Sequence, residues 1–267
     1  MTEVAAIVLA WLLTAFSCVA IGRLVLKLTA PEDIAEEAPV CFVVGAAGLS
    51  LLMFALCSLR LVHMPVLVGL ACGVLVTGWR LGWRRLRWWL GPQLPKPLKW
   101  TTGVVGLAFC LLYLSQALGP EMSPDGSTYH LGLVGRYWRE HGFTRITTHM
   151  YANLSQGVEL VYLFAYAFGR HSAAAMVHFT FLLATVGTML AYGRRFGLGP
   201  VAVAGAILFF ASPVTGMDGT TAYNDVAVAA ILFVLFYLVE AWRSEASGKL
   251  LVPVGILAGY AYAAKYT

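Results

Sequence analysis

Long apolar stretches, separated by short polar segments, run through the whole chain. Most of them reach the roughly 18 residues that a helix needs to cross the hydrocarbon core of a bilayer. Lipid cannot hydrogen-bond to backbone groups, and the stretches are continuous rather than alternating, so helices are favoured over barrel strands. The pattern predicts an all-α polytopic membrane helical bundle of about eight transmembrane helices, at residues 4–27, 39–60, 64–82, 100–118, 172–192, 198–213, 222–241 and 250–266.

Two further segments are predicted to be helices that do not cross the membrane. The stretch "GVELVYLFAYAFG" (157–169) is apolar but too short for a comfortable crossing. Within 128–141, Leu131, Val134 and Trp138 share one face of a helix, which is typical of a helix that lies in the membrane interface. We expect both segments in an outer loop, the first as an interfacial or re-entrant helix.

Composition agrees with a membrane protein, because 60% of the residues are hydrophobic and only 12% are Asp, Glu, Lys or Arg. The basic, tryptophan-rich segment 79–100 is interpreted as a cytoplasmic loop under the positive-inside rule, with a nucleic-acid surface as the remote alternative. Arg194, Arg195, Arg243 and Lys249 then fall inside, and residues 119–157 and 212–225 fall outside. A lipid bilayer is an expected partner and nucleic acid is not.

This topology brings Asp125, Asp218 and Asp225 to one membrane face. Asp225 begins an apolar helix, where an ionisable group is costly and indicates function by default. The alternative is that Asn224 or Asp225 caps the helix, because side-chain oxygens there accept backbone N–H bonds. The sequence leaves both interpretations open.

Asp125 lies in "SPDG", a strong turn sequence, so its carboxylate could simply close an Asx-turn. Ser127 or Thr128 would then cap the helix that follows. Turn chemistry does not explain the adjacent Tyr129 and His130. His130 could bond Asp125 or Asp225 or line a pocket, and a simple polar contact at the membrane interface is the alternative.

An acid that closely follows a span, a Tyr-His pair, a helix ending in "EHGF" and the later "NLSQGVELVYLFAYAFG" resemble the first outer loop of one family. That family is the bacterial GT-C glycosyltransferases of the family 39 and RgtA/B/C/D-like type. The segments "LAYGRRFG", "AYNDVAVA" and "GYAYAAKYT" also look like those that follow in such proteins, so the resemblance covers about residues 100–267.

The resemblance implies a membrane enzyme that transfers a sugar from a polyprenyl-phosphate-linked donor to a glycan, lipid or protein acceptor at the outer face. In the family an acid of the first outer loop is the catalytic base, which matches Asp125, and a second acid at the outer end of a later helix matches Asp225. Two departures are clear: Gly126 stands where many relatives have a second acid, and Gln156-Gly157-Val158-Glu159 stands where some have a Lys-Pro-Pro phosphate signature.

Cations near the leaving phosphate should matter more than a general acid. Arg170, His171 and Lys265 are the predicted cations, and Lys265 could instead extend to the interface as terminal lysines commonly do. The full set of predicted substrate-binding residues is Tyr129, His130, Glu159, Arg170, His171 and Lys265. A Mg²⁺ or Mn²⁺ site built from Asp125, Asp218, Asp225 and His130 is conceivable because oxygen ligands suit these ions, but no metal site or cofactor is predicted.

On this interpretation residues 1–99 form a three-helix extension with the basic cytoplasmic loop, and 100–267 form a transferase-like core that is incomplete at its carboxyl end. A short natural protein is the alternative. The expected location is the bacterial inner (cytoplasmic) membrane, crossed many times, with the active face outward.

The rival functions are a transporter, a non-catalytic scaffold and an inactive transferase fragment. An enzyme needs Asp125 and Asp225 at one outer cavity, whereas a transporter needs a polar path through the bundle.

Overall fold

The computed structural model describes residues 3–88, 91 and 95–265. Over these residues the chain is helical, and its only strand-like pairing is an isolated bridge between Glu37 and Arg87. Five of the described helices are long and apolar enough to cross a membrane. They are α1 (Glu3–Thr29), α3 (Ala38–Ser58), α5 (Lys96–Ala117), α7 (Gly157–Arg195) and α10 (Asp225–Glu245). The predicted all-α class and multi-pass membrane character are confirmed.

The span count of about eight is not confirmed by helix length and composition. Helices α4 (Met64–Arg80) and α11 (Leu251–Ala264) are shorter, and α8 (Gly199–Phe210) joins α9 (Pro213–Gly219) at a bend of 69°. Counting that bent pair as one broken span raises the number from five to six. The remaining short elements are α2 (Glu32–Ala35), η1 (Trp83–Arg85), η2 (Gly126–His130), α6 (Leu131–Arg139), η3 (Met150–Asn153) and η4 (Gly248–Leu250).

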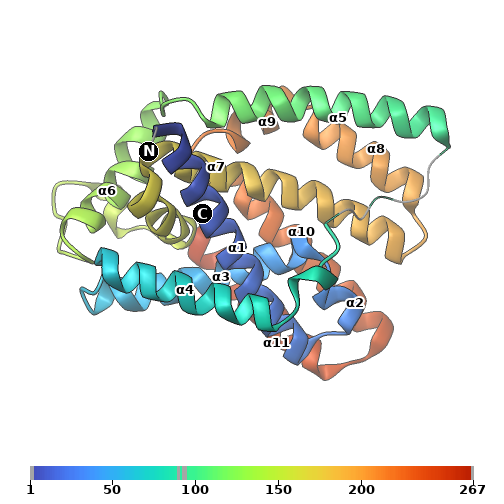
Figure 1. Cartoon of the computed structure of the whole chain (residues 1–267), viewed down its shortest axis with the longest axis horizontal. Coiled ribbons are helices and arrows are strands. Elements are labelled where there is room, and N and C mark those ends of the chain that lie inside the picture. The colour runs from blue at the N-terminus through green and yellow to red at the C-terminus, as the bar shows by residue number, and fades with distance from the viewer. Residues whose placement is uncertain (1–2, 89–90, 92–94, 266–267) are drawn as a thin grey trace.

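Helices α1 and α3 cross at glycines and then pack together on α7 (Figure 1). A Cβ atom on Gly22 would lie 1.8 Å from the Cys41 carbonyl oxygen, and one on Gly45 would lie 1.6 Å from that of Cys18. Small residues let helix backbones approach this closely in membranes. The buried apolar core is continuous across residues 1–99 and 100–267, so the predicted extension and the predicted core share one interior.

Helix α7 joins two segments that the sequence pattern separates. Residues 157–169 and the predicted span 172–192 follow one another within α7 as two helical segments that meet at a kink. Arg170, with φ 64° and ψ −156°, breaks the helical backbone at that junction. A straight helix of 39 residues would exceed the thickness of a bilayer core by far, since each residue adds about 1.5 Å. The residue that ends the expected short helix is therefore a break within α7.

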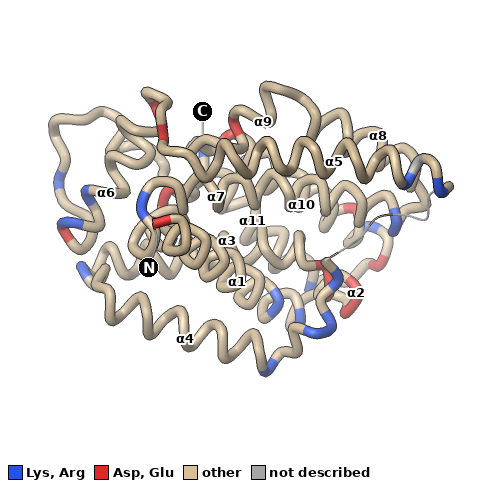
Figure 2. The backbone as a smooth tube through the Cα atoms, turned by 45° about the horizontal axis from the view of Figure 1, so that its top comes forward, with Lys and Arg blue, Asp and Glu red and all other residues tan. Residues whose placement is uncertain are grey.

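Charged residues gather at the ends of the bundle, and long stretches of α4 and α5 between them carry none (Figure 2). At the end away from α6, segments that were predicted to be cytoplasmic meet in ion pairs. Arg194 lies 2.8 Å from buried Glu37, and Arg195 pairs with Asp33. Arg87 of the basic loop also contacts Glu37, at 3.9 Å. These ion pairs connect the α2 region and the basic loop to the end of α7.

Candidate functional site

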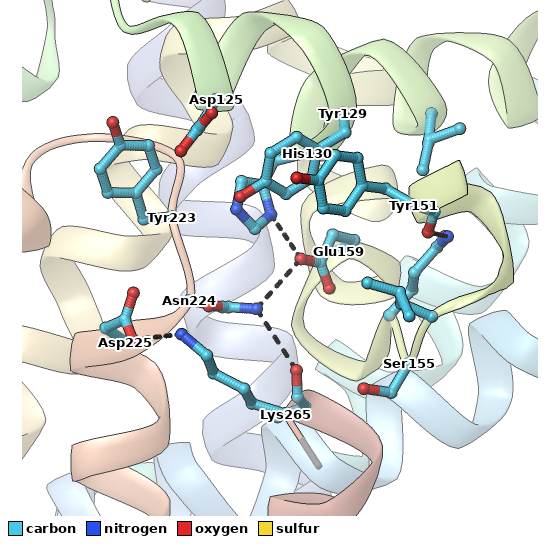
Figure 3. A pocket seen from close by; sticks show the side chains of 14 residues that line it. Asp125, Tyr129, His130, Tyr151, Ser155, Glu159, Tyr223, Asn224, Asp225 and Lys265 are labelled. Atoms are coloured by element: carbon cyan, nitrogen blue, oxygen red, sulfur yellow. Dashed lines mark hydrogen bonds and ion pairs between the residues drawn. The ribbon is translucent and has the colours of Figure 1, made fainter. Parts of the chain in front are cut away.

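A cavity of about 310 Å³ opens at the end of the bundle where α6 lies (Figure 3). Its walls come from η2, η3, the start of α7, the start of α10 and the end of α11. The lining residues are Asp125, Tyr129, His130, Leu133, Tyr151, Leu154, Ser155, Gln156, Glu159, Tyr223, Asn224, Asp225, Ala264 and Lys265. We call this cavity the acidic pocket, because it contains three carboxylates and a single lysine.

Six of the eight predicted site residues line the acidic pocket: Asp125, Tyr129, His130, Glu159, Asp225 and Lys265. The other two do not. The guanidinium of Arg170 lies over the ring of Tyr166, 5.9 Å from its centroid. The ring of His171 is 2.8 Å from the hydroxyl of Ser172, which in turn donates to the Gly119 carbonyl. Both cations therefore have partners elsewhere and do not line the pocket.

The helical turn that carries Asp125 begins earlier than the sequence indicates. Ser123 caps it, because its hydroxyl accepts the Gly126 N–H at 3.0 Å and its carbonyl accepts the Ser127 N–H at 3.1 Å. Neither Ser127 nor Thr128 is the cap, and Asp125 has helical backbone angles rather than those of an Asx-turn. The carboxylate of Asp125 makes no capping bond and lines the pocket.

A π-helical turn, η2, follows Asp125 and carries both Tyr129 and His130. Such wide turns are rare and are frequent at functional sites. Tyr129 stacks on Tyr151 with ring centroids 4.2 Å apart and planes 16° apart. Burial, followed by the nearby Asp125 carboxylate, raises the pKa of Tyr129 above its ordinary value, so the phenol keeps its proton. The two rings form an aromatic wall beside the carboxylates.

His130 and Glu159 form a buried pair at the base of the pocket. The two side chains are each 5% exposed, and Nδ1 of His130 lies 2.6 Å from Oε1 of Glu159. The amide of Asn224 reaches the same oxygen at 3.5 Å and donates to the Ala264 carbonyl at 3.3 Å. Oε2 of Glu159 is buried without a hydrogen-bond partner among the described residues. The hydrogen bonds from His130 and Asn224 thus account for only one oxygen of this carboxylate.

The start of α10 is capped by residues from other helices, not by Asp225. The carboxylate of Asp218 accepts the Val226 N–H at 2.8 Å, and Nε2 of His178 accepts the Ala227 N–H at 3.2 Å. Asn224 makes no side-chain capping bond. Asp225 is therefore free to face the pocket, where Nζ of Lys265 lies 2.6 Å from its Oδ1 (Figure 3). The capping interpretation of Asp225 and Asn224 is wrong.

The conceivable metal site is not assembled as a cluster. Asp218 is engaged with α10 and lies 3.8 Å from His178, and it does not line the acidic pocket. Among the described residues, no group of three or more His, Cys, Asp or Glu side chains is arranged to hold a metal ion. Of the four residues considered from the sequence, Asp125, His130 and Asp225 line the pocket and Asp218 does not.

Sequence reasoning missed several residues of the pocket. Tyr223 lies two positions before Asp225, and Gln156 lies at the start of an apolar segment, so their nearness to predicted site residues was the available signal. Tyr151 lies in the short helix η3 and Ser155 lies after it, and the sequence shows no periodicity there that would have predicted them. Glu121 was also missed: it lies outside the acidic pocket and accepts the backbone N–H groups of Ser123 and Ala222, which ties the Asp125 loop to the segment before α10.

Comparisons with protein-family models, with curated proteins and with solved structures give no match for this chain. Four residues of the acidic pocket, Asp125, His130, Glu159 and Asp225, belong to the short sequence motifs that carry the resemblance.

Proposed function

We propose that the acidic pocket is the active site of a membrane glycosyltransferase that moves a sugar from a polyprenyl-phosphate-linked donor to an acceptor. The observation that carries the proposal is the meeting of Asp125, Glu159 and Asp225 with a wall of tyrosines in one cavity. Carboxylates accept hydrogen bonds from sugar hydroxyls, and aromatic rings supply flat apolar area for the C–H faces of a sugar ring. A cavity of about 310 Å³ is at the small end of the usual range for ligand pockets, which suits one sugar unit.

In this proposal Asp125 is the base that takes the proton of the acceptor hydroxyl. The acceptor oxygen forms a bond to the anomeric carbon, the bond from that carbon to the phosphate oxygen breaks, and the electron pair leaves with the phosphate. General base catalysis of this kind contributes typically about 10²–10⁴-fold to the rate. The exposed position of Asp125 at the mouth of the pocket supports access to an acceptor that arrives from outside.

Lys265 is the cation that this pocket offers to the donor phosphate. Of the predicted cations, Arg170 and His171 lie elsewhere, and the lining residues include no other lysine or arginine. Lys265 is held beside Asp225 at 2.6 Å. We propose that Asp225 orients this ammonium group and that a phosphate oxygen becomes its second partner.

The proposed topology has eight crossings, with the pocket on the outer side of a bacterial inner membrane. Besides the five long helices, it needs α4, the α8–α9 pair and α11 to run between the two ends. Three contacts support this. The rings of His63, before α4, and His141, after α6, lie in a tilted arrangement with centroids 4.0 Å apart. Tyr113 of α5 donates to the Phe210 carbonyl at the end of α8, and Asn224 donates to the Ala264 carbonyl at the end of α11.

The test uses the purified chain in lipid nanodiscs with a panel of radiolabelled polyprenyl-phosphate hexoses, pentoses and uronic acids. Release of free polyprenyl phosphate is measured with and without added membrane glycolipid. We expect turnover with at least one donor, and Asp125→Asn should lower it by about 10²–10⁴-fold because the amide cannot take a proton.

Glu140→Gln is the matched control, since Glu140 follows α6, pairs with Arg136 at 2.8 Å and does not line the pocket. This variant should keep the wild-type rate. Equal turnover by the wild-type protein and Asp125→Asn would exclude Asp125 as the base, and the absence of turnover with every donor would count against the transferase itself.

A further inference from the structure

The His130–Glu159 pair has the geometry of an imidazole held by a buried carboxylate. Oε1 of Glu159 lies 2.6 Å from Nδ1 of His130. An ionised carboxylate can only accept a hydrogen bond, so with ionised Glu159 the ring is the donor and its proton is on Nδ1. In neutral imidazole the other nitrogen, Nε2, is then the acceptor. Figure 3 shows that second nitrogen pointing away from Glu159. The pair therefore presents a basic nitrogen from a ring that lines the acidic pocket.

Two features of the His130–Glu159 pair would not be needed if its hydrogen bond only stabilised the fold. The carboxylate of Glu159 is buried, yet Asn224 and His130 satisfy only one of its oxygens, so its charge is left to act mainly on the ring. His130 also sits on the π-helical turn that brings Tyr129 and the imidazole to the pocket side by side, with ring centroids 4.3 Å apart. A carboxylate that orients an imidazole fixes its tautomer and stabilises the imidazolium that forms when the ring takes a proton.

Several titratable groups face His130 from the elements around it. Glu159 and the buried His178 belong to α7, and Asp125 and Tyr129 belong to the loop and turn before it. Tyr151, Tyr223, Asp225 and Lys265 complete the pocket wall. Glu159 is the one of these groups with a direct hydrogen bond to the ring. It is therefore the group that a variant should change first.

We infer that His130 is the residue that stores the proton released by a bound hydroxyl, and that Glu159 is its positioning residue. Imidazole is the side chain whose ordinary titration lies closest to neutral pH, which suits it to accept a proton and return it to solvent between turnovers. In the step, the hydroxyl O–H bond breaks as Asp125 takes the proton, the oxygen forms its bond to the anomeric carbon, and the phosphate leaves with the electron pair. The proton then passes from the Asp125 carboxyl to Nε2 of His130, which restores the Asp125 carboxylate. The reaction in this step rests on the proposed function; the tautomer and the titration of His130 do not.

The first experiment needs no substrate. Protein labelled with ¹⁵N-histidine is followed by NMR between pH 4 and pH 9, and the His130 signals are identified by their loss in His130→Gln. We expect neutral His130 to carry its proton on Nδ1, and we expect Glu159→Gln to move the midpoint of its protonation to lower pH. Glu140→Gln should leave that midpoint unchanged. A proton on Nε2, or an equal midpoint in the wild-type protein and Glu159→Gln, would overturn the inference.

A second measurement reports the reactivity of Nε2. Diethyl pyrocarbonate acylates neutral, accessible imidazole, and peptide mass spectrometry assigns the modified histidine. We expect His130 to react at a rate that follows its NMR titration and to react at a different pH midpoint in Glu159→Gln. If His130 does not react in the correctly folded wild-type protein, Nε2 does not reach the pocket and the inference is wrong.

Where a donor is turned over, the pH dependence of kcat distinguishes the role of His130 from the transferase function itself. His130→Gln should lower kcat by about 10²–10⁴-fold with little change in KM, and Glu159→Gln should shift the acid limb of the profile to lower pH. If the His130–Glu159 hydrogen bond only stabilised the fold, Glu159→Gln would change the amount of folded protein without moving the acid limb of the pH profile. Loss of activity in Asp125→Asn alone, with a wild-type profile in His130→Gln, would retain the transferase and reject the role of His130.

Discussion

Asp225 and Lys265 show how a residue at a helix start can be free for function. Their side chains are 59% and 39% exposed and their charged atoms lie 2.6 Å apart. Ion pairs this exposed contribute about 0–1 kcal/mol to stability, because water screens them and ordering two side chains costs entropy. The pair therefore contributes little to the stability of the fold, and both side chains lie at the pocket, where the proposed function makes the donor phosphate a partner of Lys265.

Asp225→Asn is expected to lower the free energy of unfolding by less than about 1 kcal/mol. In the transfer assay the same variant should raise KM for the donor, since Lys265 loses the carboxylate that orients it. Thermal unfolding in detergent and donor titrations measure the two effects. A large fall in Tm would contradict this prediction, because it would assign Asp225 to the fold.

At the scale of elements, the crossing of α1 and α3 depends on two glycines. Each Cβ that an alanine would add meets a backbone carbonyl, at 1.8 Å for Gly22 and 1.6 Å for Gly45, and backbone cannot move aside as a flexible side chain can. The same pair of helices packs on α7, which carries Glu159. A change that separates α1 from α3 should therefore also disturb the packing of both helices on α7.

Gly22→Ala is expected to destabilise the protein by about 1–3 kcal/mol, the usual cost of overpacking. Gly73→Ala in α4 is the control, because nothing lies within 4 Å of the added Cβ there. Its effect should be neutral or stabilising by up to about 1 kcal/mol, since alanine is the better helix former. Thermal unfolding in one detergent compares the two, and equal effects would contradict the close crossing.

The capping of α10 is a second property of elements. Asp218 and His178 come from α9 and α7, yet together they satisfy the first free N–H groups of α10. This arrangement fixes the direction in which α10 leaves the pocket. It also explains why an acid at the start of an apolar helix need not be a cap.

For the whole molecule, the proposed topology places residues 119–157 and residues 246–250 on opposite sides of the membrane. Single cysteines at Met150, whose side chain is exposed, and at Lys249 test it in intact cells. Met150→Cys should react with a membrane-impermeant maleimide added outside, and Lys249→Cys should react only after the membrane is permeabilised. The unsubstituted chain supplies the background from its own five cysteines. The reverse pattern, or equal labelling of both, would overturn the orientation.

Apolar length and charge are local properties, so the sequence alone determined the helical class, five of the spans and the segments that meet at each end. It also pointed to Asp125, His130 and Asp225, because polar residues beside apolar helices stand out. Only the tertiary structure decided that Glu159 holds His130 across 29 positions of sequence, that Asp218 caps α10, and that two of the predicted cations, Arg170 and His171, lie outside the pocket. Such pairings depend on how each helix is rotated and bent when the bundle packs, and no local pattern of residues encodes that rotation.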